Sequence, residues 1–246
     1  PSGETDQVTT YTFGTTKGTS AGDSKIATGH MLKKVQYPDS SDATNDIVAF
    51  AYNAQGQEIW KRDQATSGDN ADYNIIETTY DDSGRQTARK VTQKRSAADG
   101  AVLRIATAYD SLGRVETVTQ YDDATAGNVV DQVKNVYDGW GNLTNFRQDK
   151  DSTVGESGYW EVTYTYAKAT TGRNTLRRTG ITLPGGTTYT FNYRTTGSLD
   201  SDASRVSSIS DAEATAIATY AYNGVGQVVR TDLDEPVLFS KLFTSS

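Results

Sequence analysis

The chain has 246 residues, a formal net charge of −7 and no cysteine. The negative charge argues against a nucleic-acid-binding protein, because phosphate binding needs a basic face, and the lack of cysteine excludes disulfides and thiolate metal sites. Tyrosine outnumbers phenylalanine fifteen to six, and threonine and glycine are frequent, which is typical of strands and turns rather than of helices. No stretch approaches the roughly 20 apolar residues of a membrane span.

Residues 1–46 form an N-terminal region with one strand candidate, around Val8 to Phe13, which we expect to cap the fold or join it to another molecule. The only histidine, His30, lies in this region. We interpret it as a surface residue in a loop rather than as a catalytic base, because no nucleophile and acid partner can be identified for it.

Residues 47–230 contain seven repeats of one pattern, whose tyrosines lie 27 to 29 residues apart. These anchor tyrosines are Tyr52, Tyr80, Tyr109, Tyr137, Tyr166, Tyr193 and Tyr222. Five of them are followed at once by an Asp or Asn, namely Asn53, Asp81, Asp110, Asp138 and Asn223. Six carry a glycine four places on: Gly56, Gly84, Gly113, Gly141, Gly197 and Gly226. A fixed period near 28 residues predicts a stacked array rather than an enzyme core.

The residues after each anchor tyrosine predict a β-hairpin turn, and the cleanest copy runs from Tyr109 to Val115. The Asp110 side chain can accept a hydrogen bond from the backbone two residues on. Gly113 suits the left-handed conformation that closes a type I turn with a G1 bulge. We therefore expect a strand to end at each anchor tyrosine and another to begin shortly after the glycine.

The incoming strands alternate as a half-buried strand should. Positions two and four before each tyrosine share its face, so we expect the anchor tyrosines to stack as the core of the sheet rather than as a glycan platform. Polar connections at 65–72, 96–100, 122–128 and 149–158 join one hairpin to the next.

Three places depart from the pattern. Ala167 follows Tyr166, which predicts a longer turn, and Arg194 follows Tyr193. The segment from Asp211 to Ala218 has helical propensity, but the register predicts that it ends in the strand entering Tyr222.

The C-terminal tail, residues 231–246, contains an apolar cluster from Val237 to Phe243. We expect it to pack on its own domain, with docking on a neighbouring subunit as the alternative. Seven hairpins give about fourteen strands, more than an open sheet holds without curling. The array would also leave an edge strand at each end, ready to pair with another chain.

The repeat resembles the YD-repeat, or RHS-repeat, family, whose pattern is Tyr-Asp, two variable residues, Gly-Arg and an aliphatic residue. Residues 109–115 match it throughout, 80–85 match up to the last place, and 137–143 replace Arg with Asn142. The copies beginning at Tyr52 and Tyr222 are looser. The resemblance implies an all-β array of hairpins that forms a coiled or spiral sheet, as in the shells of bacterial toxin complexes and in teneurins.

The sequence and the resemblance together favour a non-enzymatic, extracellular structural protein of a bacterial surface, forming part of a shell, tube or filament. One alternative is a fragment of a shell that encloses a C-terminal toxin, although the self-cleaving segment rich in Asp-Pro that such shells carry has no counterpart in the four prolines of this chain. Another is an adhesion or glycan-binding module acting through Trp60, Trp140 and Trp160. We expect no cofactor, and self-association or neighbouring YD repeats as partners.

Overall fold

The computed structural model describes residues 8–38, 47–64, 73–125, 127–155, 158–168, 176–194 and 197–234. Over these ranges the chain is all-β, with sixteen strands and one short helix, α1 (Leu199–Asp202). The first eight strands are β1 (Thr10–Thr15), β2 (Thr28–Gln36), β3 (Ile47–Tyr52), β4 (Glu58–Gln64), β5 (Tyr73–Tyr80), β6 (Gln86–Gln93), β7 (Arg104–Tyr109) and β8 (Val115–Tyr121). The others are β9 (Val129–Tyr137), β10 (Leu143–Lys150), β11 (Trp160–Lys168), β12 (Leu176–Thr182), β13 (Thr188–Tyr193), β14 (Val206–Ser210), β15 (Ala216–Tyr222) and β16 (Val228–Leu233).

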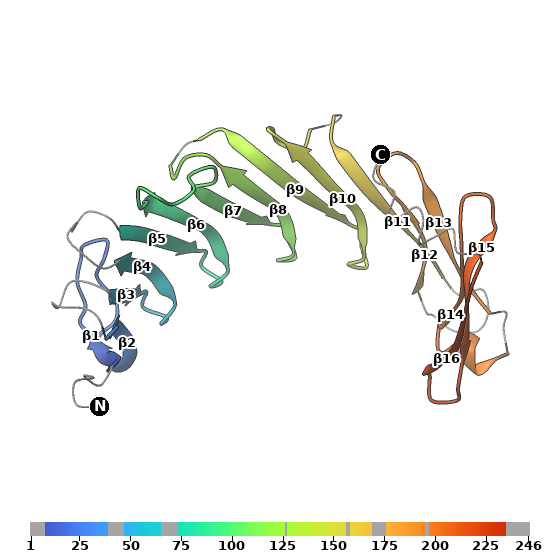
Figure 1. Cartoon of the computed structure of the whole chain (residues 1–246), viewed down its shortest axis with the longest axis horizontal. Helices are drawn as coiled ribbons and strands as arrows, with labels where there is room; N and C mark the ends of the chain where they lie inside the picture. The colour runs from blue at the N-terminus through green and yellow to red at the C-terminus, as the bar shows by residue number, and fades with distance from the viewer. Residues whose placement is uncertain are drawn as a thin grey trace, which may run out of the picture. The chain divides into compact units, whose positions relative to one another are not determined.

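The strands follow one another in the sheet in chain order, from β1 to β16 (Figure 1). Six anchor tyrosines end an odd-numbered strand, whereas β11 continues two residues beyond Tyr166, to Lys168, because Ala167 and Lys168 still pair with β12. The next strand returns antiparallel in each hairpin whose register is given, for example β5 with β6 and β7 with β8. The predicted array of hairpins is therefore confirmed. The order is open, with β1 and β16 at its two ends.

The sheet has two strands more than the fourteen that the seven repeats predict, because the N-terminal region contributes a hairpin of its own, β1 with β2. The strand expected at 8–13 begins and ends two residues later, at Thr10–Thr15. His30, expected in a loop, is exposed on β2. The apolar tail at 237–243 lies outside the described residues.

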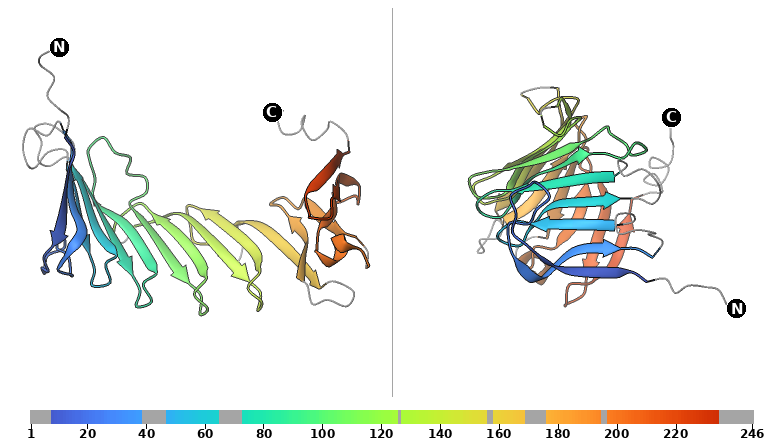
Figure 2. Two further views of the ribbon diagram at one scale, coloured as in Figure 1. Left: turned by 90° about the horizontal axis from the view of Figure 1, so that it is seen from below. Right: turned by 90° about the vertical axis from the view of Figure 1, so that its left-hand side faces the viewer.

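The chain divides into two compact units, residues 1–133 with 149–155 and residues 134–148 with 156–246. Among the described residues of each unit, turns connect strands at both ends of the strands (Figure 2). Burial is partial, since only Val35, Ala51 and Ala218 are buried hydrophobic residues among those described. Stability must therefore come chiefly from contacts between neighbouring hairpins rather than from a thick core.

The connection between β1 and β2 closes over the first repeat. The Lys25 amide donates to the Tyr52 carbonyl at 2.6 Å, and the Tyr52 amide donates to the Ser24 hydroxyl at 3.1 Å. The position of a Cβ on Gly22 lies 3.4 Å from the Trp60 ring. Trp60, one of the three tryptophans proposed as a contact surface, is therefore partly covered.

Some connections between repeats are tighter than the polar loops expected from the sequence. The Leu183 amide bonds the Thr187 carbonyl at 2.8 Å, and the Asp211 amide bonds the Thr215 carbonyl at 3.0 Å. Ala214 takes the left-handed position in the second turn, at φ 63. The stretch with helical propensity is thus a turn followed by β15, as the register predicts, because the Asp211 side chain accepts from two backbone amides.

Candidate functional site

The anchor tyrosines lie at β-bulges. In six hairpins the strand register shifts at the tyrosine itself, so that one extra residue stands on the returning strand: Tyr52, Tyr80, Tyr109, Tyr166, Tyr193 and Tyr222. A bulge leaves the extra residue outside the hydrogen-bonding ladder. Next to the extra residue, Ile59 in the first case, stands the residue that faces the tyrosine, Glu58.

The next tyrosine along the chain donates a hydrogen bond to that residue. The hydroxyl of Tyr80 donates to the Glu58 carbonyl at 2.9 Å, and Glu58 is the residue opposite Tyr52. The other bonds of this kind are Tyr52 to Leu32 (2.7 Å), Tyr109 to Gln86 (2.8 Å), Tyr166 to Leu143 (3.0 Å), Tyr193 to Arg178 (2.8 Å) and Tyr222 to Val206 (2.8 Å). Each tyrosine thus joins its own hairpin to the preceding one.

The first of these joints shows that the N-terminal hairpin belongs to the same series. Leu32, which accepts from Tyr52, pairs with Phe13 at a register shift. Phe13 therefore occupies the position of an anchor tyrosine without its hydroxyl. The sequence pattern misses this copy because neither Tyr nor the Asp turn is present there.

The Asp or Asn after each tyrosine organises the turn. The Oδ1 atom of Asp110 accepts from the backbone amides of Leu112 and Arg114, both at 2.9 Å. The Gly113 amide then bonds the Asp110 carbonyl at 2.9 Å, with the glycine at φ 82. The same bonds recur at Asn53, Asp81, Asp138 and Asn223.

The Arg of the motif forms a second link between repeats. Arg85 is held by Asp81, with Nε 2.7 Å from Oδ2, and its guanidinium carbon lies 4.4 Å from the centre of the Tyr109 ring. A Cβ on Gly113 would lie 2.7 Å from the Arg85 Nη1. The glycine is therefore needed for its left-handed backbone, and a Cβ there would also displace the end of the Arg85 side chain.

Where the turn residue is Asn, a Gln takes the place of the Arg. The Asn53 amide donates to Gln57 Oε1 at 2.8 Å, and Gln57 Nε2 donates onward to the Gly84 carbonyl at 2.7 Å. Asn223 and Gln227 form the same pair, also at 2.8 Å. In the Asp–Arg pair the turn residue accepts the hydrogen bond, and in the Asn–Gln pair the turn residue donates it. The turn residue and the residue four places on therefore vary together.

The joints perturb two kinds of titrating group. Burial, together with the nearby Glu58 carboxylate, raises the pKa of the Tyr80 hydroxyl, and burial is the largest cause that raises the pKa of Tyr52, Tyr166 and Tyr193. Hydrogen bonding from the Arg85 backbone and side chain lowers the pKa of Asp81. Both shifts favour the form that the joint uses, a neutral tyrosine donor and an ionised aspartate acceptor.

Of the remaining repeat residues, Gly197 departs from the turn geometry. Tyr137 ends β9, and Asp138 and Gly141 form the following turn. Gly197 lies at φ 93 between β13 and α1, where the connection is long, rather than in a tight turn.

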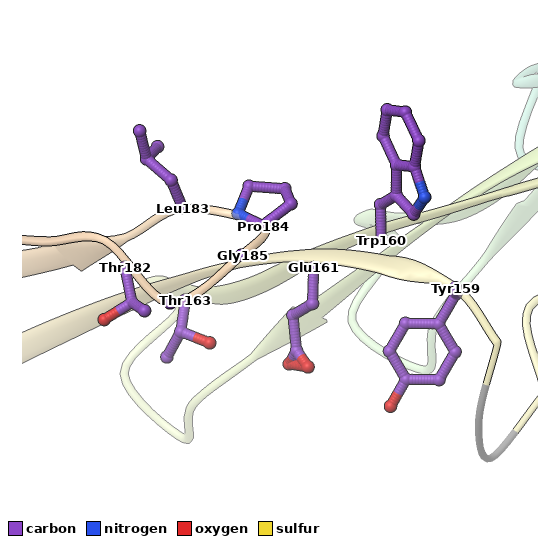
Figure 3. Close-up of a pocket in the computed structure, with 9 residues that line it drawn as sticks. Tyr159, Trp160, Glu161, Thr163, Thr182, Leu183, Pro184 and Gly185 are labelled. Carbon is purple, nitrogen blue, oxygen red and sulfur yellow. The ribbon is translucent and has the colours of Figure 1, made fainter.

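Exposed aromatic side chains form the other feature of interest. Trp140 is 89% exposed and Trp160 is 73% exposed. Trp140 lines a hollow of about 620 Å³ with Asn142, Lys168 and Leu176. A second hollow, of about 600 Å³, lies beside β11, with the Tyr159 and Glu161 side chains on one face and Trp160 on the other (Figure 3).

The structure offers little for metal chemistry. No group of three or more His, Asp or Glu side chains is placed to hold a metal ion within the described ranges. No helix in the part of the chain that the structure describes is long and apolar enough to cross a membrane.

The fold resembles solved structures of much longer chains. In the crystal structure of TcdB2-TccC3-Cdc42 the matching chain is 13% identical, with a TM-score of 0.52, and the match covers 93% of this chain and 11% of that one. A structure of TcdB2-TccC3 without its hypervariable C-terminal region is 15% identical over 89% of this chain and 11% of that chain, with a TM-score of 0.48. No protein-family model and no curated protein matches the sequence. The likeness is therefore one of fold, and this chain spans about a tenth of the chains it matches.

Proposed function

We propose that this chain is a non-enzymatic, extracellular structural protein, a segment of the wall of a YD-repeat shell, tube or filament. The observation that carries the proposal is the repeated joint, in which the hydroxyls of six anchor tyrosines donate to a backbone carbonyl of the hairpin before them. The residues of the repeat pattern hold neighbouring hairpins together, as in a wall, rather than forming a pocket.

The composition of the joint supports the same role. Its hydrogen bonds run from side chain to backbone, or within the turn, so that one hairpin can follow another without a matched side-chain partner. In such an array stability is approximately a sum of repeat and interface contributions. Length can then change by whole repeats, which suits a building element.

The test is to remove one repeat in register. Deleting residues 81–109 joins Tyr80 directly to Asp110 and preserves the hairpin pattern, so we expect a folded, shorter array with a β circular dichroism spectrum and cooperative melting. Deleting residues 81–95 removes only the turn and β6 and breaks the register, which makes it the control. A one-repeat deletion that unfolds as fully as the control would contradict the array role.

The extracellular part of the proposal needs its own measurement. In the producing cells, the chain should be digested by protease added to intact cells or recovered from the medium. Protection of the chain until the cells are lysed would contradict an extracellular wall.

A glycan-binding role is the second candidate, because Trp140 projects from its turn almost fully exposed. A glycan array would test it with Trp140→Ala and Trp160→Ala. Leu112→Ala is a matched control, since Leu112 holds the same place in its turn as Trp140 and is also exposed. Binding lost only with the tryptophans supports this candidate, and absence of binding in the unmodified chain removes it.

A further inference from the structure

The turn after Tyr222 contains the only Asn-Gly pair of the sequence, Asn223 with Gly224. Glycine has no Cβ, so its amide nitrogen is the least hindered backbone nucleophile that can stand next to an asparagine carboxamide. Gly224 is exposed, and a Cβ built on it would meet nothing within 4 Å. Its amide donates to none of the described residues. The nitrogen is therefore open to react with the side chain that precedes it.

The Asn223 carboxamide is held by the turn and activated by it. Its Oδ1 accepts from the backbone amides of Val225 and Gln227, at 3.2 and 2.9 Å, and its Nδ2 donates to Gln227 Oε1 at 2.8 Å. When a nucleophile attacks Cγ, negative charge develops on Oδ1. The two amides already point at that oxygen, in the manner of an oxyanion hole.

Arg205 acts on the nucleophile. Its Nη1 donates to the Asn223 carbonyl oxygen at 3.1 Å and lies 2.9 Å from Asp200 Oδ1. The Arg205 side chain is only 15% exposed. The Asn223 carbonyl belongs to the same peptide group as the Gly224 nitrogen, so a cation on its oxygen stabilises the negative charge that the group gains when the nitrogen loses its proton.

We propose that Asn223 and Gly224 form a self-modification site at which Asn223 is deamidated. The Gly224 nitrogen forms a bond to Asn223 Cγ, the bond from Cγ to Nδ2 breaks, and ammonia leaves with the proton that the nitrogen gave up. Water then opens the cyclic imide, at Cγ to give an aspartate or at the main-chain carbonyl to give an isoaspartate. The change occurs once in each chain, so it goes beyond the structural role proposed above and does not rest on it.

The turn at Asn53 is the natural comparison, because it has the same side-chain bonds. Oδ1 of Asn53 accepts from Gln55 and Gln57 at 3.0 and 2.9 Å, and Nδ2 donates to Gln57 Oε1 at 2.8 Å. The following residue is Ala54, whose Cβ hinders the attack. Of the described residues, only the Gly56 amide donates to the Asn53 carbonyl. Asn53 therefore lacks both the open nucleophile and the cation.

The two products affect the hairpin differently. An aspartate keeps Oδ1 as an acceptor and is the residue that Asp81 and Asp110 already supply in their turns. An isoaspartate adds a methylene to the main chain inside the turn. We therefore expect the amides of β15 and β16 to lose hydrogen-exchange protection in the isoaspartyl fraction alone.

Peptide-mapping mass spectrometry of the full-length chain, incubated at mildly alkaline pH, tests the site. We expect Asn223 to be converted to aspartate and isoaspartate while Asn53 stays unchanged. Gly224→Ala gives this turn the residue that follows Asn53, so it should abolish the conversion and keep the circular dichroism spectrum. An Asn223 that stays unchanged, or an Asn53 that converts at the same rate, would overturn the proposal.

A second variant isolates the contribution of Arg205 without altering that residue. Ala54→Gly creates another Asn-Gly pair in a turn with the same bonds but with no cation on the carbonyl. We expect Asn53 of this variant to convert about tenfold more slowly than Asn223 in the same chain, the lower value of a charge-assisted hydrogen bond. Equal rates would overturn the role of Arg205. The in-register deletion is scored by folding alone, so these outcomes leave the wall role to its own test.

Discussion

Replacing Tyr80 by Phe removes one hydroxyl and nothing else from the joint between the first two tyrosine hairpins. That hydroxyl donates to the Glu58 carbonyl at 2.9 Å, and Glu58 faces Tyr52 at the register shift. The ring keeps its contacts, so the change isolates the hydrogen bond. The joint is half-buried, and the carbonyl is left without its donor.

The expected loss follows from the value of such a bond. A neutral intramolecular hydrogen bond contributes about 0.5–1.5 kcal/mol, and a buried acceptor left unsatisfied costs about 1–3 kcal/mol. Because Tyr80 is only partly buried, water can reach the carbonyl and the loss belongs to the lower range, about 1 kcal/mol. A loss of that size raises the population of the opened joint about fivefold, at RT of about 0.6 kcal/mol.

Native-state hydrogen exchange can measure this joint by itself. The amides of β4 and β5 should lose about fivefold in protection, whereas those of β12 and β13 should be unchanged, because contacts in an array run between neighbours. Tyr73→Phe is the matched control on the same strand, since the Tyr73 ring contacts Arg62 and its hydroxyl donates to none of the described residues. Equal loss in the two variants, or no loss in Tyr80→Phe, would refute the reasoning.

Three further predictions concern the turns and the ends of the pH range. Gly113→Ala should destabilise the chain by about 1–2 kcal/mol in urea unfolding, because the residue is left-handed and Arg85 fills the space of a Cβ. Ala214→Gly should stabilise it by up to about 1 kcal/mol, since Ala214 holds the same left-handed position; opposite signs would contradict the assignment of these turns. Because the pKa of Asp81 is lowered, its contribution to folding stability is complete above about pH 4 and is lost as the pH falls further. Because the pKa of Tyr193 is raised, its contribution to folding stability is complete below about pH 10 and is lost as the pH rises further. Melting temperatures across pH should therefore fall at both ends, and a melting temperature that stayed level on raising the pH through this range would contradict the role of the tyrosine hydroxyl.

The sequence by itself determined the repeat and its turns. Alternation with period two and the chain-reversing residues are local properties, so the strands ending at Tyr80 and Tyr109 and the turn at Asp110–Gly113 could be predicted. The register outweighed the helical propensity at residues 211–218 for the same reason. The sequence showed where the tyrosines lie, but it did not show that their hydroxyls bond the preceding hairpin.

Only the tertiary structure decided what the tyrosines do. Their partners are backbone carbonyls, such as that of Glu58, which lies 22 residues before Tyr80. Every residue has a carbonyl, so no side-chain pattern marks the acceptor, and a bulge becomes visible only when two strands are paired. The same reason hid Phe13 as the first member of the series and placed Arg85 over the next tyrosine rather than in solvent. The turn residues recur within each repeat and are therefore visible in the sequence. The hydrogen bond that joins the repeats into an array forms between two hairpins and is visible only in the structure.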